Sequence, residues 1–239
     1  ASGGILLMVA TVVALVWANS PWSGSYYDFW HTEVSFSIGD VVSLDANGHS
    51  LTLVEFVNDV LMAVFFFVVG LEIKREMVTG ELRRPRAAVL PVAAALGGMV
   101  VPALVFLAFN PSGAGSTGWG IPMATDIAFA VGVVSLLGRR VPTSLKVFLL
   151  SLAIVDDIGA ILVIAVFYTS DLVMDWLLVG LATTVAVVLL TRAKVWYTPF
   201  YILLGSVLWY AMFRSGVHTT IAGVAMGLLA PARPLLDRA

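Results

Sequence analysis

Two adjacent carboxylic acids, Asp156 and Asp157, lie near the middle of the apolar run over residues 147–168. A run of this length can cross a bilayer, which needs about 20 mostly apolar residues. Each acid would then lie near the bilayer centre, where insertion scales give a cost of about 2.5–3.5 kcal/mol. Ionisable residues at that depth are rare and usually belong to an ion or proton pathway. The pair is therefore the first candidate for chemistry.

The two acids of this pair should have different roles. Neighbouring residues on a helix point about 100° apart, so the carboxylates cannot share one face. We predict that one faces a water-filled funnel and binds a hard cation, for which oxygen ligands are suited. The other faces the bundle interior and pairs with a base or takes a proton, so cation binding and protonation compete. The plainer alternative is a structural pair satisfied by cations on neighbouring helices.

A third acid, Asp126, follows Pro122 by four residues in the apolar segment 121–137. Proline removes a backbone donor, and Thr125 offers a hydroxyl to exposed backbone groups. We predict an interrupted helix, because helix ends and carbonyls exposed at membrane depth can replace the water around an ion. The alternative is an ordinary proline at a helix entrance with Asp126 as its N-cap.

Weaker candidates lie at the end of the second apolar segment, where charges are mixed: Glu72, Lys74, Arg75 and Glu76. They could form a proton-sensitive network, or a solvated helix end with weak ion pairs. His218 could sense pH, because an unperturbed histidine titrates near pH 6.5. A lone histidine is nevertheless more often an ordinary polar residue.

The composition places these residues in a membrane protein. Hydrophobic residues make up 60% of the chain and charged residues 12%, against about a quarter charged in soluble domains. We predict an all-α polytopic membrane protein whose residues 1–239 form a single membrane domain, with ion-site helices over 121–137 and 146–168. Apolar runs bounded by charged residues, Pro or Gly predict about eight transmembrane helices: 3–18, 56–71, 87–109, 121–137, 146–168, 176–190, 200–213 and 217–229. The last two are short, so the count could fall to seven.

The basic residues orient these helices. They fall between predicted helices two and three, four and five, six and seven, and after eight, and only Arg214 falls on the other side. The positive-inside rule then places both ends of this segment in the cytoplasm. We expect membrane lipids around the chain and no nucleic-acid partner. The absence of cysteine excludes a disulfide framework and a thiolate metal site.

The segment between the first two predicted helices carries acids but no Lys or Arg. Polar and apolar residues alternate around Asn47 and Gly48, which predicts a small extracytoplasmic β-hairpin over residues 34–54. An exposed hairpin edge could pair with a copy of itself and give a homodimer. The alternative is a solvated loop without a partner.

Glycines in three of the predicted helices could let neighbouring backbones approach closely. They are Gly97, Gly98, Gly132 and Gly159. Packing alone, without a role in the site, is their plainer function.

Four motifs together resemble the bacterial sodium/proton antiporter A family over residues 5–231. They are Ala124-Thr-Asp-Ile-Ala-Phe-Ala, Leu152-Ala-Ile-Val-Asp-Asp-Ile-Gly-Ala-Ile, Met62-Ala-Val-Phe-Phe-Phe-Val-Val-Gly-Leu-Glu-Ile-Lys-Arg-Glu and Ser215-Gly-Val-His-Thr-Thr-Ile-Ala-Gly. The first two are highly specific. The resemblance implies a multi-pass protein of the bacterial cytoplasmic membrane that expels Na⁺ or Li⁺ against inward H⁺ flow, is regulated by pH and needs no cofactor.

The resemblance also implies roles for single residues. Asp157 matches the primary ligand of the transported Na⁺, and Asp156 matches its partner and switch. Thr125 and Asp126 match the polar centre of a broken helix. The pH-sensing positions are matched by Glu72, Arg75, Glu76 and His218. The 34–54 hairpin matches a dimer contact.

The family fold has two inverted halves whose interrupted helices cross at the ion site. It continues with four more helices beyond the point where this chain ends, and these hold the second crossing helix and a buried lysine that faces Asp156. The chain therefore resembles half of an inverted-repeat antiporter. We expect it to be incomplete for transport without those helices.

Other functions remain open at this point. A non-transporting structural or assembly subunit is one, favoured by the missing helices. An intramembrane aspartyl protease using Asp126 and one acid of the later pair is another. It is weaker, because adjacent aspartates are not needed for that chemistry and no Gly-x-Gly-Asp element accompanies them. A transporter that carries an organic solute with protons is a third.

Overall fold

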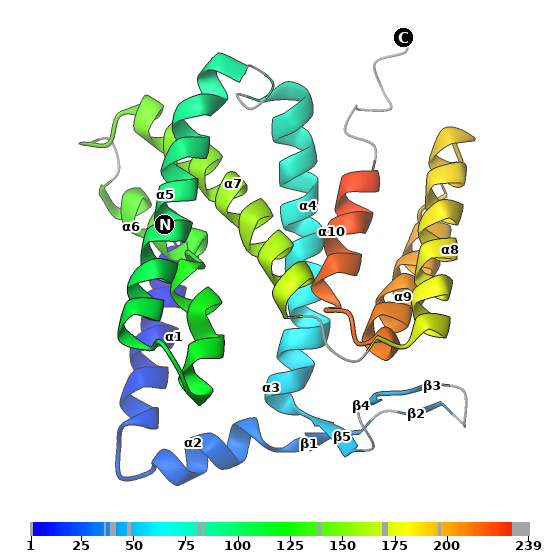
Figure 1. Ribbon diagram of the computed structural model, residues 1–239, viewed down its shortest axis with the longest axis horizontal. Coiled ribbons are helices and arrows are strands. Elements are labelled where there is room, and N and C mark those ends of the chain that lie inside the picture. The colour runs from blue at the N-terminus through cyan, green and yellow to red at the C-terminus, as the bar shows by residue number, and fades with distance from the viewer. Residues whose placement is uncertain are drawn as a thin grey trace. The chain divides into compact units, whose positions relative to one another are not determined.

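The computed structural model describes residues 2–35, 37–38, 42–46, 49–80, 83, 85–137, 140–168, 172–195 and 197–230 (Figure 1). The chain divides into two compact units. The first holds Ala1–Leu61 and Asp126–Lys146, and the second holds Met62–Thr125 and Val147–Ala239. The acid pair and Thr125 therefore belong to the second unit, whereas Asp126 belongs to the first.

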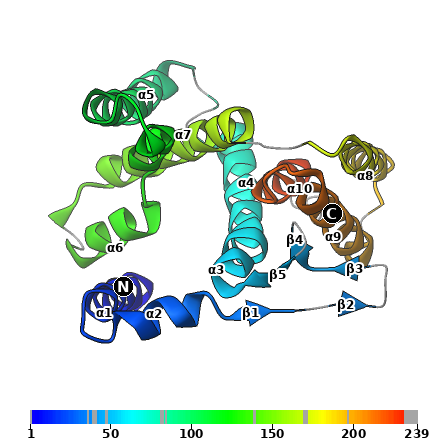
Figure 2. The same cartoon turned by 60° about the horizontal axis from the view of Figure 1, so that its bottom comes forward.

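The first unit begins with a sharply bent pair of helices. Helix α1 (Ser2–Ala18) is apolar on all sides, and α2 (Ser23–Trp30) leaves it at an angle of 115° (Figure 2). The bend is held by a hydrogen bond of 2.9 Å from Trp17 Nε1 to Ser25 Oγ. Rings from both helices then pack on one another, as an apolar helix next to an aromatic-rich one favours.

Helix α6 (Ile127–Leu137) packs against α1 in the same unit. The contact is made by two glycines: a Cβ at Gly132 would lie only 3.0 Å from Gly4 Cα. The predicted close approach of backbones at Gly132 is therefore confirmed.

The predicted hairpin region forms short antiparallel strands. Strands β1 (Glu33–Val34), β5 (His49–Thr52) and β4 (Asp45–Ala46) make a sheet in the order β1-β5-β4, with Glu33 opposite Thr52 and Ala46 opposite His49. Strands β2 (Ser37–Ile38) and β3 (Val42–Ser43) pair separately. The antiparallel pairing is confirmed, while the predicted turn residues Asn47 and Gly48 lie outside the described part of the chain.

A continuous helical segment, Leu53–Thr79, follows β5. It starts as α3 (Leu53–Phe56), where Thr52 and Glu55 form a capping box that satisfies the first backbone donors. It passes through one π-helical stretch, η1 (Val57–Leu61), and continues as α4 (Met62–Thr79).

In the second unit, α4 and α10 (Thr220–Leu229) lie side by side and touch through glycines (Figure 1). A Cβ at Gly70 would lie 2.8 Å from Val224 O, and one at Gly227 would lie 2.8 Å from Gly70 Cα. The Lys74 ammonium donates a hydrogen bond of 2.7 Å to Leu228 O, one of the carbonyls left unpaired at the end of α10.

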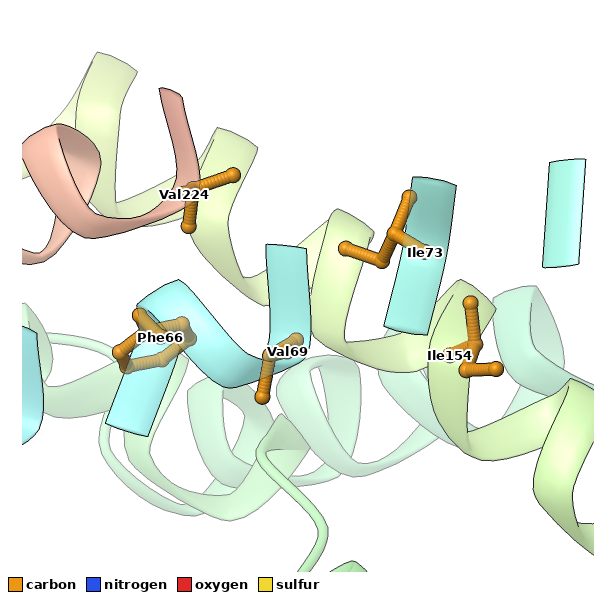
Figure 3. Close-up of a cluster of buried hydrophobic side chains, with 5 residues drawn as sticks. All are labelled: Phe66, Val69, Ile73, Ile154 and Val224. Carbon is orange, nitrogen blue, oxygen red and sulfur yellow. The ribbon is translucent and has the colours of Figure 1, made fainter. Parts of the chain in front are cut away.

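Helix α7 (Thr143–Phe167) joins this pair through a buried cluster. Phe66, Val69 and Ile73 of α4 meet Ile154 of α7 and Val224 of α10 (Figure 3). The helix that carries the acid pair is therefore anchored to α4 and α10 by apolar packing.

Two further pairs complete the second unit. Helix α5 (Pro85–Phe109) packs on the 3₁₀ helix η3 (Ala114–Met123), and α8 (Met174–Arg192) packs on α9 (Thr198–Ser215). Ala95, Met99 and Met123 form the buried core of the first contact. Val187, Leu208 and Met212 are buried in the second.

Each of the eight predicted apolar ranges overlaps a helix in the described part of the chain, but eight spans are not confirmed. Among the described residues, four helices are long and apolar enough to cross a bilayer: Leu53–Thr79, Ala88–Phe109, Ser144–Phe167 and Met174–Arg192. A fifth is added if the bent α1–α2 pair counts as one. The predicted span over 121–137 is split into two short pieces, and α10 has only 10 residues. The chain is a mostly helical, multi-pass membrane protein.

The prediction of close contacts at Gly97 and Gly98 is wrong within the described residues. No described atom lies within 4 Å of a Cβ built at either position. At Gly159 a Cβ would meet only the flexible end of the Met99 side chain. The glycines of α4 and α10, which lie against backbone, make the closer helix contact.

Replacing Gly223 by alanine should lower the stability of the protein. A Cβ at Gly223 would lie 3.0 Å from Ala63 C and 3.0 Å from Phe67 N, both backbone atoms that cannot rotate away. Overpacking of this kind costs about 1–3 kcal/mol. Thermal unfolding of the purified whole protein in detergent measures the loss as a lower melting temperature. Gly98→Ala is the matched control, and an equal loss in both variants would contradict the packing account.

Candidate functional site

Helix α7 presents the acid pair to two different environments. Asp156 is buried, with 2% of its surface exposed, and Asp157 beside it is half-buried. This difference follows from the rotation of about 100° between neighbouring helical residues. The prediction that the two carboxylates do not share one face agrees with these exposures.

A helix break lies opposite Asp156. Helix η3 ends at Met123, Ala124 is extended (φ −78°, ψ 129°), and α6 begins only at Ile127. Thr125, inside this break, donates its backbone N–H to Asp156 Oδ2 at 3.3 Å. Its hydroxyl donates a second hydrogen bond to the same oxygen. The interrupted helix is confirmed, and the structure brings Thr125 and Asp156 together.

These contacts satisfy an otherwise costly group. A buried carboxylate without partners would lose the hydrogen bonds that water supplies. The freed N–H and hydroxyl of the break supply replacements, and both hydrogen bonds that Asp156 accepts in the described part of the chain come from Thr125. The donors of the break and the Asp156 carboxylate therefore satisfy each other's need for a hydrogen-bond partner.

Asp126 has a different local role. Its side chain is exposed, and its Oδ1 accepts a hydrogen bond of 2.9 Å from the Phe129 N–H in the first turn of α6. This is the N-cap geometry that the sequence left as the plainer alternative. The same carboxylate lies at the positive end of the α6 dipole, which stabilises it.

Like charges gather around Asp157. The carboxylates of Asp156 on α7 and Glu72 on α4 both interact electrostatically with it. Even so, the described residues contain no group of three or more acidic or histidine side chains able to hold a metal ion.

The predicted pH-sensing residues lie on the last turns of α4 and near the start of α10. Glu72 and Arg75 are exposed, and Glu76 is half-buried. His218 is also exposed, and its Nε2 lies 3.1 Å from Tyr168 O, the carbonyl that follows the end of α7. His218 thus links α10 to the helix that carries the acid pair.

Two further residues were not singled out from the sequence. Tyr168 bonds through its hydroxyl to η3, 48 and 51 residues earlier in the chain. Asp59 lies in η1, inside the apolar segment Leu53–Thr79. The signal for Asp59 was available, since it is an acid in a predicted span. Nothing in the sequence indicates which segment Tyr168 contacts.

Apolar side chains pack together next to the site, between η3, α5 and α7. Met123, at the end of η3, is buried with Ala95 and Met99 of α5, and Leu152 and Val155 of α7 pack against them. The arrangement is a buried, hydrogen-bonded carboxylate next to a half-exposed one in apolar surroundings. Carboxylates in such surroundings have oxygens that can take a proton or a hard cation.

Comparison with known proteins gives a consistent result. The Na⁺/H⁺ antiporter 1 family matches residues 1–239. The Na⁺/H⁺ antiporter NhaA of Oleidesulfovibrio alaskensis is 56% identical over 236 residues, which are 99% of this chain and 51% of that protein. The Na⁺/H⁺ antiporter NhaA 2 of Syntrophotalea carbinolica is 54% identical, and the Na⁺/H⁺ antiporter NhaA of Rhodopirellula baltica is 52% identical. Each alignment covers 99% of this chain and 52% of the relative.

The chain thus spans about half the length of the curated relatives it matches. The family match covers every motif that the sequence analysis used, including the acid pair and the helix break. The chain belongs to the Na⁺/H⁺ antiporter 1 family.

Proposed function

We propose that this chain is part of a secondary antiporter that exchanges cytoplasmic Na⁺ or Li⁺ for external H⁺ at Asp156 and Asp157. The observation that carries the proposal is the hydrogen-bonded pair of Thr125 and Asp156 beside the half-buried Asp157. All three lie in or against a helix apolar enough to cross a membrane. The antiporter names of the relatives support the same activity.

In this proposal, repulsion between the carboxylates of Asp156 and Asp157 is the reason that a proton and a cation exchange for each other. Two carboxylates side by side in a medium of low dielectric constant repel each other strongly. Binding of either a proton or a cation relieves that repulsion, so the two compete for the same pair. Asp157, the more exposed acid, is the ligand for the cation. Na⁺ and Li⁺ are the cargo, and no cofactor takes part.

Thr125 gives Asp156 and Asp157 different roles in this proposal. Two of its donors already occupy Asp156 Oδ2, which leaves that oxygen less available to a cation. Asp156 is thereby held as the partner of Asp157, and the break in the helix supplies the donors. Asp126 takes part by capping α6 and so fixing where the second half of the broken helix begins.

The rest of the whole protein completes the site in this proposal. A lysine from further helices faces Asp156, which suits a carboxylate that is buried. Glu72, Arg75, Glu76 and His218 regulate the exchange with pH. The protein lies in the bacterial cytoplasmic membrane with both ends of this segment in the cytoplasm. The 34–54 strands pair two copies into a homodimer.

Asp157→Asn should abolish Na⁺-dependent proton flux. Asparagine keeps the size of the side chain but cannot bind a proton or bring a negative charge to the cation. We expect the flux on adding Na⁺ or Li⁺ to everted vesicles with the whole protein to fall by more than about tenfold, or about 1.4 kcal/mol.

The matched control is Asp175→Asn, which changes an exposed acid in the first turn of α8. It should leave the flux close to that of the unaltered protein. Full flux in Asp157→Asn would remove Asp157 from the mechanism.

Thr125→Val should lower both the thermal stability of the protein and its Na⁺-dependent flux, while Thr125→Ser should retain both. Valine has the shape of threonine but lacks the hydroxyl, so Asp156 loses one of the two hydrogen bonds that Thr125 donates to it. A buried acceptor deprived of its partner costs about 1–3 kcal/mol. Melting temperature and Na⁺-dependent flux measure the two effects. Equal behaviour of the valine and serine variants would show that the hydroxyl is not used.

A further inference from the structure

The segment that leads into the helix break, η3, is weakly held by its own hydrogen bonds. Its ten residues form a 3₁₀ helix, although such helices rarely exceed three or four residues because their hydrogen bonds are poorly aligned. Pro122 removes one more backbone donor. Contacts with other helices must therefore keep η3 in place.

Tyr168, just after α7, provides such a contact. Its hydroxyl donates a hydrogen bond of 2.8 Å to Thr117 O and accepts one of 3.0 Å from the Gly120 N–H. The ring of Trp119 packs on those of Phe167 and Tyr168, with centroids 5.2 Å and 6.2 Å apart. One phenol thus binds both a donor and an acceptor of η3.

The Tyr168 phenol approaches η3 at Gly120, which has no side chain. A Cβ at Gly120 would lie 2.7 Å from Tyr168 Oη and 3.0 Å from its Cε2. A Cβ contact of 2.7 Å is essentially absent from folded proteins, so the phenol or the helix would have to move. The contact therefore depends on both residues.

The two segments are joined at both ends. Along α7, Asp156 and Tyr168 are 12 residues apart, or about 18 Å at 1.5 Å per residue. Along η3, Thr117 and Met123 are six residues apart, or about 12 Å at 2.0 Å per residue, and the two steps through the extended Ala124 to Thr125 add about 6–7 Å. These lengths match for antiparallel segments, with Tyr168 holding one end and Asp156 the other.

We propose that Tyr168 is a positioning residue: by fastening η3 to the end of α7, it sets how Thr125 engages Asp156 and thereby how tightly the site binds its cation. The effect on cation binding rests on the proposed function. The fastening itself does not, because it concerns only the hydrogen bonds between η3 and α7. Tyr168 acts through Thr125 and does not touch the ion.

Tyr168→Phe tests the proposal, since phenylalanine keeps the ring against Trp119 and removes only the hydroxyl. In the purified whole protein, amide hydrogen exchange in residues 114–125 should become faster by at least about three- to tenfold, the factor given by one ordinary hydrogen bond, because the hydroxyl makes two hydrogen bonds to η3. In proteoliposomes with Na⁺ as the substrate, the apparent KM should rise by a similar factor while the maximal rate changes less.

Gly120→Ala provides a second route to the same change, because it displaces the phenol without altering Tyr168. If both variants break the same contact between Tyr168 and η3, amide exchange in the double variant should be no faster than in either single variant. Tyr201→Phe is the matched control: its hydroxyl also donates to a backbone carbonyl, Val195 O at 2.8 Å, but within the α8–α9 region. It should leave residues 114–125 unchanged.

The possible results separate the two proposals. Unchanged exchange in Tyr168→Phe, or equal acceleration in Tyr201→Phe, overturns the fastening of η3 by Tyr168. Faster exchange with an unchanged apparent KM overturns its link to the ion site. If the unaltered protein shows no Na⁺-dependent proton flux, the proposed function fails, and the exchange data still decide whether Tyr168 fastens η3.

Discussion

The hydrogen bonds between Thr125 and Asp156 satisfy two costly groups at once. An acid in an apolar helix needs donors, and a helix interrupted at membrane depth leaves donors without partners. Here the N–H and hydroxyl of the break meet the buried carboxylate, so each defect removes the cost of the other. Other features of the second unit place these two elements together: the cluster on α4 and α10 holds α7, and the contact with α5 holds η3.

The sequence predicted the elements of this site better than their contacts. The acid pair, the proline and the threonine are visible because their residue types are unusual in apolar runs, and the break appears where they indicate it. The apolar runs also located the helices, because in lipid only internally hydrogen-bonded segments are stable. It did not establish the number of spans, since length and apolarity qualify only four helices, or five with the bent pair, within the described residues.

Contacts between distant segments could not be predicted because sequence patterns carry no information about partners. Gly97 and Gly98 have the composition of a packing site but face open space among the described residues, whereas Gly70 and Gly223 lie against backbone. Asp126 could bind an ion or cap a helix, and only the position of the Phe129 N–H shows that it caps α6. Tyr168 is an ordinary aromatic residue until its bonds to η3 are known.

The glycine contact between α4 and α10 has a mechanical consequence. Where side chains separate two helices, rotamer changes can absorb a small slide of one past the other, but here backbone meets backbone and nothing is available to yield. Lys74 also ties the end of α10 to α4. A rearrangement that opens the site must therefore carry both helices as one rigid body.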